Sequence, residues 1–326
     1  MTQIKRVAVL TSGGDAPGMN AAIRAVVRKA LQENLEVYGV LRGYEGLIKG
    51  DFIEMNSKSV ANIIQTGGTI LKTARSEVFK TEEGRKLSYK NLKKAEIDAL
   101  VVIGGDGTLK GARALVDEYN FPVVGIPGTI DNDLFGTDMT IGYDTALNTV
   151  MTAVDKIRDT AMSHDRMFFV EVMGRDAGFI ALRSCIAGGA EAALIPEVET
   201  DINALHEKLL GYMRQKKTSC IIIVAEGDDA GGAFKIKERL QEFGDDFDMK
   251  VTVLGHTQRG GSPTSYDRYL ASRLGIAAIE ALIDDQRSIM VGMINNEIVH
   301  VPFNKTIKHH RTIDQKMLEI INTLNT

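Results

Sequence analysis

The chain has 326 residues, of which 44% are hydrophobic and 25% are charged, and its formal net charge is −4. This composition is that of a globular protein and excludes a disordered, collagen-like or disulfide-stapled chain. Because there is no large cationic excess, generic nucleic-acid binding is not expected.

Short β-branched runs bounded by glycine recur along the chain and predict buried strands. In chain order they are Val7–Leu10, Val37–Val40, Leu100–Ile103, Val123–Ile126, Phe168–Val172, Ile221–Ala225 and Val251–Leu254. Apolar residues at helical spacing predict helices over 23–31 and 146–161. Strands that alternate with amphipathic helices indicate parallel sheets covered on both faces. A chain above ~250–300 residues tends to divide its core, so we expect an α/β fold with two lobes and a ligand cleft between them.

The cysteines and the apolar runs indicate the compartment. Cys185 and Cys220 lie in apolar surroundings without CxxC spacing, which is typical of free thiols in a reducing cytosol. The stretch 7–10 is too short for a signal-peptide core. The apolar run Cys220–Ala225 is far below the ~20 residues that cross a bilayer. We therefore expect a cytoplasmic protein that does not enter a membrane.

A glycine-rich segment, Gly104-Gly105-Asp106-Gly107-Thr108, lies between a predicted strand and a helix expected to begin near Thr108. Glycines let backbone N–H groups approach phosphate oxygens, and the helix N-terminus adds partial positive charge. Asp106 is suited to a hydrated Mg²⁺ that bridges phosphates. The structural alternative is a glycine turn with a capping threonine. The sequence contains no GxxxxGK[ST] loop. It also lacks the dinucleotide fingerprint, because Gly105 and Gly107 are followed by lysine and not by glycine at position 110.

A second segment, Pro127 to Asp133, follows the predicted strand Val123–Ile126 and carries Asp131 and Asp133. In extended backbone both carboxylates point the same way. Phosphoryl transfer to an alcohol requires a carboxylate that accepts the hydroxyl proton beside groups that handle a metal. The structural alternative is an Asx-rich turn.

Four arginines lie next to glycine-rich or strand-end segments: Arg75, Arg166, Arg175 and Arg259. Guanidinium groups match phosphate geometry in a bidentate way. A single arginine of this kind is more often a surface or salt-bridge residue. Four at predicted strand ends favour a site for anionic ligands.

The chain contains, in order, TSGGDAPGMN from Thr11, GGDGT, PGTIDND, MGR from Met173 and GHTQRGGSP from Gly255. In these motifs it resembles the bacterial ATP-dependent 6-phosphofructokinases, the phosphofructokinase A family, over residues 4 to about 303. The resemblance implies a glycolytic enzyme that uses ATP, Mg²⁺ and fructose 6-phosphate, and a homotetramer. It also implies two Rossmann-like lobes, with ATP on 1–141 plus 256–303 and the sugar phosphate on 142–255 plus 304–326.

The resemblance assigns roles to individual residues. The ATP site would comprise Gly14, Tyr44, Arg75, Ser76, Gly105, Asp106, Gly107 and Thr108, with Asp106 serving Mg²⁺. Asp131 would be the catalytic base, while Thr129, Asp133 and Arg175 position and neutralise the transferred phosphoryl group with help from Arg75 and Gly14. The sugar-phosphate pocket would comprise Thr129, Ile130, Asp131, Arg166, Met173, Gly174, Arg175, Glu226, Lys250, His256, Thr257, Gln258 and Arg259. Arg166 and Lys250 would reach in from a neighbouring subunit.

The resemblance also implies an effector pocket for ADP and phosphoenolpyruvate. Its residues would be Arg24, Arg28, Lys58, Arg158, Gly189, Glu191 and Lys217. Ser57 and Gln215 stand where the family often has basic residues, and Lys250 replaces a usual arginine. Because Ser57 and Gln215 carry no charge, we expect a weakened effector response. Lys250 offers a point charge in place of a bidentate fork, so we expect a lower affinity for the sugar phosphate.

Two glycines bear on the phosphoryl donor. Related pyrophosphate-dependent enzymes resemble this chain but carry Asp where Gly107 stands and Lys where Gly128 stands. Glycine at 107 leaves room for the ATP α-phosphate, and glycine at 128 removes a cation suited to pyrophosphate. The alternatives are pyrophosphate-dependent phosphofructokinase, a nicotinamide or lipid kinase that shares GGDGT alone, and a non-catalytic nucleotide or sugar-phosphate sensor.

Overall fold

The computed structural model describes residues 4–163, 166–215, 219–244, 247–308 and 312–324. The chain forms two compact units. The first comprises Met1–Ile130, Leu134–Thr145 and Arg259–Arg311, and the second comprises Asp131–Asp133, Ala146–Gln258 and Thr312–Thr326. The segments 142–145 and 304–308 thus cluster with the first unit, and 131–133 and 256–258 with the second, which differs from the boundaries expected from the resemblance.

The first unit contains a seven-stranded sheet in the order β11-β10-β5-β4-β1-β2-β3. Its interior strands are parallel, while the outer pairs β2–β3 and β10–β11 are antiparallel. The strands are β1 (Arg6–Thr11), β2 (Glu36–Val40), β3 (Phe52–Met55), β4 (Ala99–Gly104), β5 (Val123–Pro127), β10 (Ile289–Ile294) and β11 (Glu297–Pro302). The central strands are apolar throughout because helices cover both of their faces.

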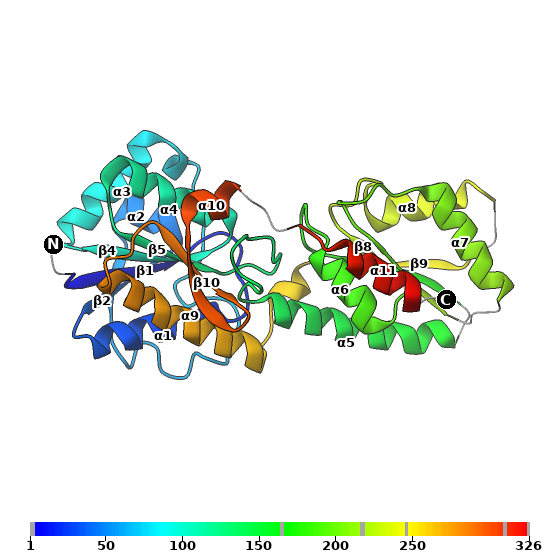
Figure 1. The fold of residues 1–326 in the computed structure, drawn as a ribbon, viewed down its shortest axis with the longest axis horizontal. Coiled ribbons are helices and arrows are strands. Elements are labelled where there is room, and N and C mark those ends of the chain that lie inside the picture. The colour runs from blue at the N-terminus through cyan, green and yellow to red at the C-terminus, as the bar shows by residue number, and fades with distance from the viewer. Residues whose placement is uncertain (1–3, 164–165, 216–218, 245–246, 309–311, 325–326) are drawn as a thin grey trace. The chain divides into compact units, whose positions relative to one another are not determined.

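Figure 1 shows α1 and α9 on one face of this sheet and α2, α3, α4 and α10 on the other. The helices are α1 (Met19–Gln32), α2 (Gly43–Lys49), α3 (Glu82–Lys94), α4 (Asp106–Tyr119), α9 (Ser265–Ile283) and α10 (Phe303–Lys308), with a 3₁₀ turn at Val78–Lys80. Leu47, Leu92, Leu109 and Phe303 from four of these helices join one buried cluster with the strands. Burial of these apolar side chains is the main force that holds the layers together.

The second unit contains a four-stranded parallel sheet in the order β7-β8-β6-β9. Its strands are β6 (Met167–Val172), β7 (Ala192–Leu194), β8 (Cys220–Ala225) and β9 (Met249–Val253). The helices α7 (Ile202–Arg214) and α8 (Gly232–Gln241) cover one face, and α6 (Phe179–Gly188) and α11 (Gln315–Leu324) lie on the other (Figure 1). α5 (Tyr143–Met162) has its first turn in the first unit and continues in the second, and a 3₁₀ turn covers Gly255–Arg259.

The α/β fold class with mostly parallel sheets is confirmed, and all seven predicted strands exist. Two predicted bounds are wrong: α4 begins at Asp106 instead of near Thr108, and β9 runs Met249–Val253 instead of 251–254. The sequence analysis missed β3, β7, β10 and β11. In the described part of the chain, no helix is both long enough and apolar enough to span a bilayer.

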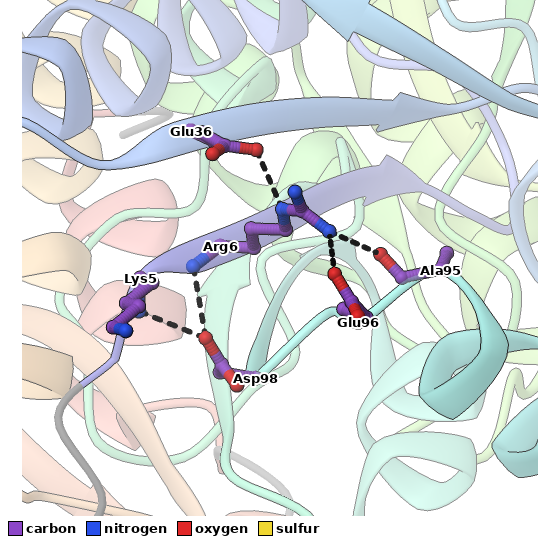
Figure 2. A network of polar contacts seen from close by, with 6 residues as sticks. All are labelled: Lys5, Arg6, Glu36, Ala95, Glu96 and Asp98. Carbon is purple, nitrogen blue, oxygen red and sulfur yellow. Dashed lines mark hydrogen bonds and ion pairs between the residues drawn. The ribbon is translucent and has the colours of Figure 1, made fainter.

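A polar network fixes the amino-terminal edge of the first sheet (Figure 2). Arg6 at the start of β1 contacts Glu36 on β2 and Glu96 in the loop before β4. Asp98 accepts the backbone N–H of Arg6 at 2.9 Å. Each surface contact is worth at most about 1 kcal/mol, but together they set the relative start of β1, β2 and β4. The same strands deliver their carboxyl ends, and the glycine-rich loops, to the opposite edge.

Candidate functional site

The phosphate-loop candidate lies where β4 passes into α4. Gly105 precedes the helix and offers no capping side chain, so the first turn of α4 presents uncapped N–H groups. A Cβ at Gly104 would lie 2.5 Å from the carbonyl oxygen of Ser12. Thr108 Oγ1 donates to that same oxygen at 3.1 Å. The loop is therefore pressed against the segment that follows β1, which requires glycine at 104.

Gly107, unlike Gly104, is not forced to be glycine by its surroundings. A Cβ built there would meet nothing within 4 Å, and its backbone is not left-handed. The fold itself therefore imposes no need for glycine at this position. Open space at the first turn of a helix is what an approaching phosphate group requires.

Asp106 is the carboxylate of this loop. Its Oδ2 atom lies 2.6 Å from Lys110 Nζ. Its Oδ1 atom is buried and has no hydrogen-bond partner among the described residues. An unmatched buried carboxylate oxygen is costly unless a ligand or cation meets it. No cluster of three or more His, Cys, Asp or Glu side chains able to hold a metal occurs in the described ranges, so any ion here would take its other ligands from water and phosphate.

Three other predicted ATP residues, Tyr44, Arg75 and Ser76, also belong to the first unit. Tyr44 is buried, donates its hydroxyl to the carbonyl of Thr108 at 2.5 Å, and stacks on Phe79 at 4.0 Å. Ser76 Oγ donates to Glu45 Oε2 at 2.8 Å. Arg75 is exposed beside it. Tyr44 thus supports the first turn of α4 from beneath, and burial raises the pKa of its hydroxyl far above its usual value.

Gly14 and Arg259 meet in the first unit, although the sequence analysis assigned them to different ligands. A Cβ at Gly14 would lie 1.9 Å from Arg259 Nη1. The same nitrogen donates to the carbonyl of Asp15 at 3.3 Å. Glycine at 14 is therefore what allows a guanidinium group to lie on the loop after β1.

The segment after β5 brings the predicted catalytic residues out of the sheet. Thr140 Oγ1 donates to the carbonyl of Thr129 at 2.6 Å, and Gly128 bridges to Ile141. A Cβ at Gly105 would be 3.4 Å from that of Thr129, so Thr129 lies beside the phosphate loop. Ile130 is fully buried.

Asp131 and Arg175 form an ion pair. Asp131 is only 4% exposed, and its Oδ2 atom lies 3.7 Å from Nε of Arg175, whose side chain is 56% exposed. Asp133 in the same short segment is half-buried. A buried carboxylate next to a solvent-accessible guanidinium is an arrangement that can hold a proton acceptor close to an anionic ligand.

Backbone contacts fix the conformation of the loop that carries Arg175. Arg175 has a left-handed backbone with φ of 53°, and its N–H donates to Glu226 Oε1 at 2.9 Å. A Cβ at Gly227 would lie 1.9 Å from the carbonyl oxygen of Arg175. Left-handed backbone at a non-glycine residue costs about 1 kcal/mol or more and is concentrated at functional sites. Gly227 and Glu226 therefore hold the backbone of this arginine in place.

The remaining pocket candidates follow β6 and β9 at the same edge of the second sheet. The backbone N–H of Met173 donates to Oε1 of buried Gln258 at 3.2 Å. Thr257 Oγ1 donates to the carbonyl of Leu254 at 2.6 Å, and His256 is exposed. Gln258 is thus a structural tie between two strand ends.

Arg166 and Lys250 lie at the opposite edge of that sheet. Arg166 directly precedes β6, and Lys250 is the second residue of the parallel strand β9. β6 has 6 residues. At about 3.3 Å per residue, the two ends of such a strand are about 20 Å apart. One copy of this sheet therefore cannot bring these two cations to the pocket residues at its other edge.

The effector candidates divide between the units. Arg24 and Arg28 lie on α1. Burial, with a smaller contribution from the charge of Arg28, lowers the pKa of Arg24. Lys58 is exposed. In the second unit, Arg158 donates to the carbonyl of Gly189 at 2.8 Å, and Glu191 accepts the N–H of Ile221 at 2.7 Å. Lys217 lies outside the described residues.

Sequence reasoning missed a clasp between the N-termini of α5 and α9. Buried Asp267 accepts the N–H groups of Gly142 at 2.9 Å and Thr145 at 2.8 Å. In return, Thr264 donates to Asp144 at 2.7 Å and accepts the N–H of Asp267. Burial raises the pKa of Asp267 to about 6. A capping Thr-x-x-Asp pattern at 264–267 was the available signal, and the clasp steadies the segment that holds Thr129.

Comparisons with known proteins place this geometry in a family. The family described as "Phosphofructokinase" matches residues 6–282. "ATP-dependent 6-phosphofructokinase 2" of Bacteroides thetaiotaomicron is 57% identical over 325 residues, covering 100% of both chains. A phosphofructokinase structure from Saccharomyces cerevisiae is similar with a TM-score of 0.85 and 38% identity over 98% of this chain, which spans 47% of the yeast chain.

A pyrophosphate-dependent phosphofructokinase structure from Marinobacter aquaeolei has a TM-score of 0.85 at 20% identity, covering 98% of this chain and 91% of the other, and it shows a shared fold alone. The family match covers most of the chain, and the Bacteroides relative matches it from end to end. The chain therefore belongs to the phosphofructokinase family.

Proposed function

We propose that this protein is an ATP-dependent 6-phosphofructokinase, which transfers the γ-phosphoryl group of ATP to the 1-hydroxyl of fructose 6-phosphate. The observation that carries the proposal is the buried carboxylate of Asp131, held 3.7 Å from the accessible guanidinium of Arg175. Family membership and the full-length relatives named for this activity support the same conclusion.

Asp131 accepts the proton of the attacking hydroxyl as the new O–P bond forms and the bond from the γ-phosphorus to the β–γ bridging oxygen breaks, releasing ADP. The transition state of such transfers is loose, so positioning and charge neutralisation supply most of the rate. Arg175 and Arg75 neutralise the transferred group. Thr129, Asp133 and the backbone at Gly14 orient it.

Asp106 is the residue that would hold Mg²⁺, because its buried Oδ1 atom has no other partner among the described residues. When bound, the ion neutralises phosphate charge. The first turn of α4, which has no side-chain cap, binds the phosphates through the backbone N–H of Gly107, since that of Thr108 is donated to the carbonyl of Gly105 at 2.9 Å. We place ATP on the first unit and the sugar phosphate mainly on the second.

The two donor-discriminating glycines support ATP over pyrophosphate. Space is open at Gly107, where the α-phosphate of ATP would lie. At Gly128, a Cβ would already lie 3.0 Å from Ile103 Cγ2 and 3.2 Å from Met19 Cε. A side chain at 128 would therefore require the ends of the Ile103 and Met19 side chains to shift by a few tenths of an ångström.

The sugar-phosphate pocket needs a second copy of the chain. Arg166 and Lys250 lie at the edge of the second sheet opposite to Met173 and Glu226, so a neighbouring subunit supplies them. This supports an assembly of more than one copy, and we propose the homotetramer and the cytoplasmic location that the family resemblance implies. ADP and phosphoenolpyruvate would bind weakly at the effector residues, since Ser57 and Gln215 offer no charge.

A coupled assay tests the proposal directly. Purified protein is given fructose 6-phosphate with ATP or pyrophosphate, with and without Mg²⁺, and fructose 1,6-bisphosphate is measured. We expect turnover with ATP and Mg²⁺ only. Turnover with pyrophosphate would assign the other donor, and ATP binding without product would identify a sensor.

A further inference from the structure

A carboxylate that the family motifs do not contain links the two cations at the amino-terminal edge of the second sheet. Asp248 Oδ1 lies 2.7 Å from Lys250 Nζ, and its Oδ2 atom lies 2.7 Å from Arg166 Nε. The side chains of Arg166, Asp248 and Lys250 are 31%, 45% and 46% exposed. The cluster therefore faces solvent and can be reached by a dissolved anion.

The backbone fixes this cluster across two strands. The N–H of Met167 donates to the carbonyl of Asp248 at 3.1 Å, and Met167 pairs with Met249 in the parallel register. Asp248 directly precedes β9 and Lys250 is its second residue, so the two side chains lie on the same side because side chains alternate along extended backbone. Asp248 thus lies between a cation on β9 and Arg166, which directly precedes the neighbouring strand β6.

The contacts leave donors for a ligand. Arg166 meets Asp248 through Nε, and neither terminal Nη nitrogen donates to another described residue. Lys250 uses one of its three N–H bonds on the carboxylate. The pair of Nη atoms can bind two phosphate oxygens at once, and the ammonium can bind a third.

The carboxylate also decides the charge of the cluster. Lys250 and then Arg166, through hydrogen bonds, hold the pKa of Asp248 below its usual range, so it is ionised at neutral pH. Without it, two positive charges on adjacent strands would repel and their long side chains would separate. Holding such side chains in one arrangement before binding lowers the cost of binding.

We propose that Asp248 is a positioning residue for the 6-phosphate of the sugar substrate, holding Arg166 and Lys250 at the spacing that a phosphomonoester requires. The inference rests on the proposed function, because it assumes that these two cations bind the substrate phosphate. It adds a residue to that site and explains how lysine can serve at position 250, since the carboxylate fixes the ammonium that a guanidinium fork would otherwise fix by its shape.

The test is the Asp248→Asn variant in the coupled assay. Freeing two long side chains should raise KM for fructose 6-phosphate by about tenfold, while kcat and KM for ATP change less than about twofold. Asp117→Asn is the matched control, since it also removes an exposed carboxylate paired with an arginine, at 3.1 Å, and it should change neither constant. Asp248→Glu keeps the charge and should recover most of the affinity.

A double-mutant cycle separates positioning from general damage. Asp248→Asn should raise KM for fructose 6-phosphate by a smaller factor in a Lys250→Ala background than in the wild type, and the two factors should differ by at least about threefold. The reason is that one of the two cations that Asp248 positions is then absent. An unchanged or lowered KM, a parallel fall in kcat, or equal effects in both backgrounds would overturn the inference. Absence of any turnover by the wild-type protein would instead refute the proposed function.

Discussion

Replacing Asp131 by Asn removes the proposed proton acceptor with almost no change in shape. Loss of a general base typically lowers the rate by about 10²–10⁴, which corresponds to about 3–5 kcal/mol of transition-state stabilisation. The effect on folding should be far smaller. No cavity forms, and an ion pair whose arginine is 56% exposed contributes at most about 1 kcal/mol.

The measurement is kcat and both KM values for Asp131→Asn, beside the melting temperature. We expect kcat to fall by two orders of magnitude or more, about 3 kcal/mol, while KM for ATP changes little. Asp98→Asn is the control, because Asp98 is a half-buried carboxylate that accepts the backbone N–H of Arg6 at the amino-terminal edge of the first sheet, opposite to the glycine-rich loops. Turnover within about threefold of wild type would refute the assignment of Asp131 as base.

Three further predictions concern other parts of the molecule. Gly107→Asp should raise KM for ATP by about tenfold or more, because it places a negative charge where the phosphates would bind. It should not lower the melting temperature, because the space around Gly107 is open. Gly211→Asp is the control, since the space at Gly211 is also open, and it should leave KM for ATP unchanged. Because the pKa of Asp267 is raised to about 6, its contribution to stability is greatest at low pH and is lost as pH rises through about 6. The stability of wild type relative to Asp267→Asn, from urea unfolding, should therefore fall by about 1 kcal/mol between about pH 5 and about pH 8, and a rise would contradict the assignment. ADP and phosphoenolpyruvate should shift half-saturation by fructose 6-phosphate less than about threefold, and Arg24→Ala should remove the remaining shift; a strong response in the wild type would show that Ser57 and Gln215 are compensated.

Most of the strands that sequence reasoning recognised are buried along their length, although β9, which is partly exposed, was recognised as well. β4 and β8 are continuous apolar runs, and such runs can hardly be anything but central strands. β3 and β11 were missed because they are edge strands in which a polar residue, Glu54 or His300, interrupts the apolar pattern. β10 contains two methionines and a glycine, and its strand character comes from its neighbours in the sheet.

The candidate site could be predicted where its residues form a local sequence motif, and less well where they are brought together by tertiary contacts. The glycine loop at 104–108 and the carboxylate at 131 can be recognised from the sequence alone. The contact of Arg259 with Gly14 joins residues far apart in the chain, and no local pattern announces it. Asp248 was missed for a similar reason, since its role depends on the register between β6 and β9.

Because cations lie at both ends of β6, inactive variants of this chain are expected to complement one another. If a neighbouring copy supplies Arg166, a lesion there disables a partner's centre and spares the centre that contains the same chain's Arg175. Two defective chains, one altered at each end of this strand, would then regain part of their turnover when mixed, since some assembled centres would draw on both intact ends.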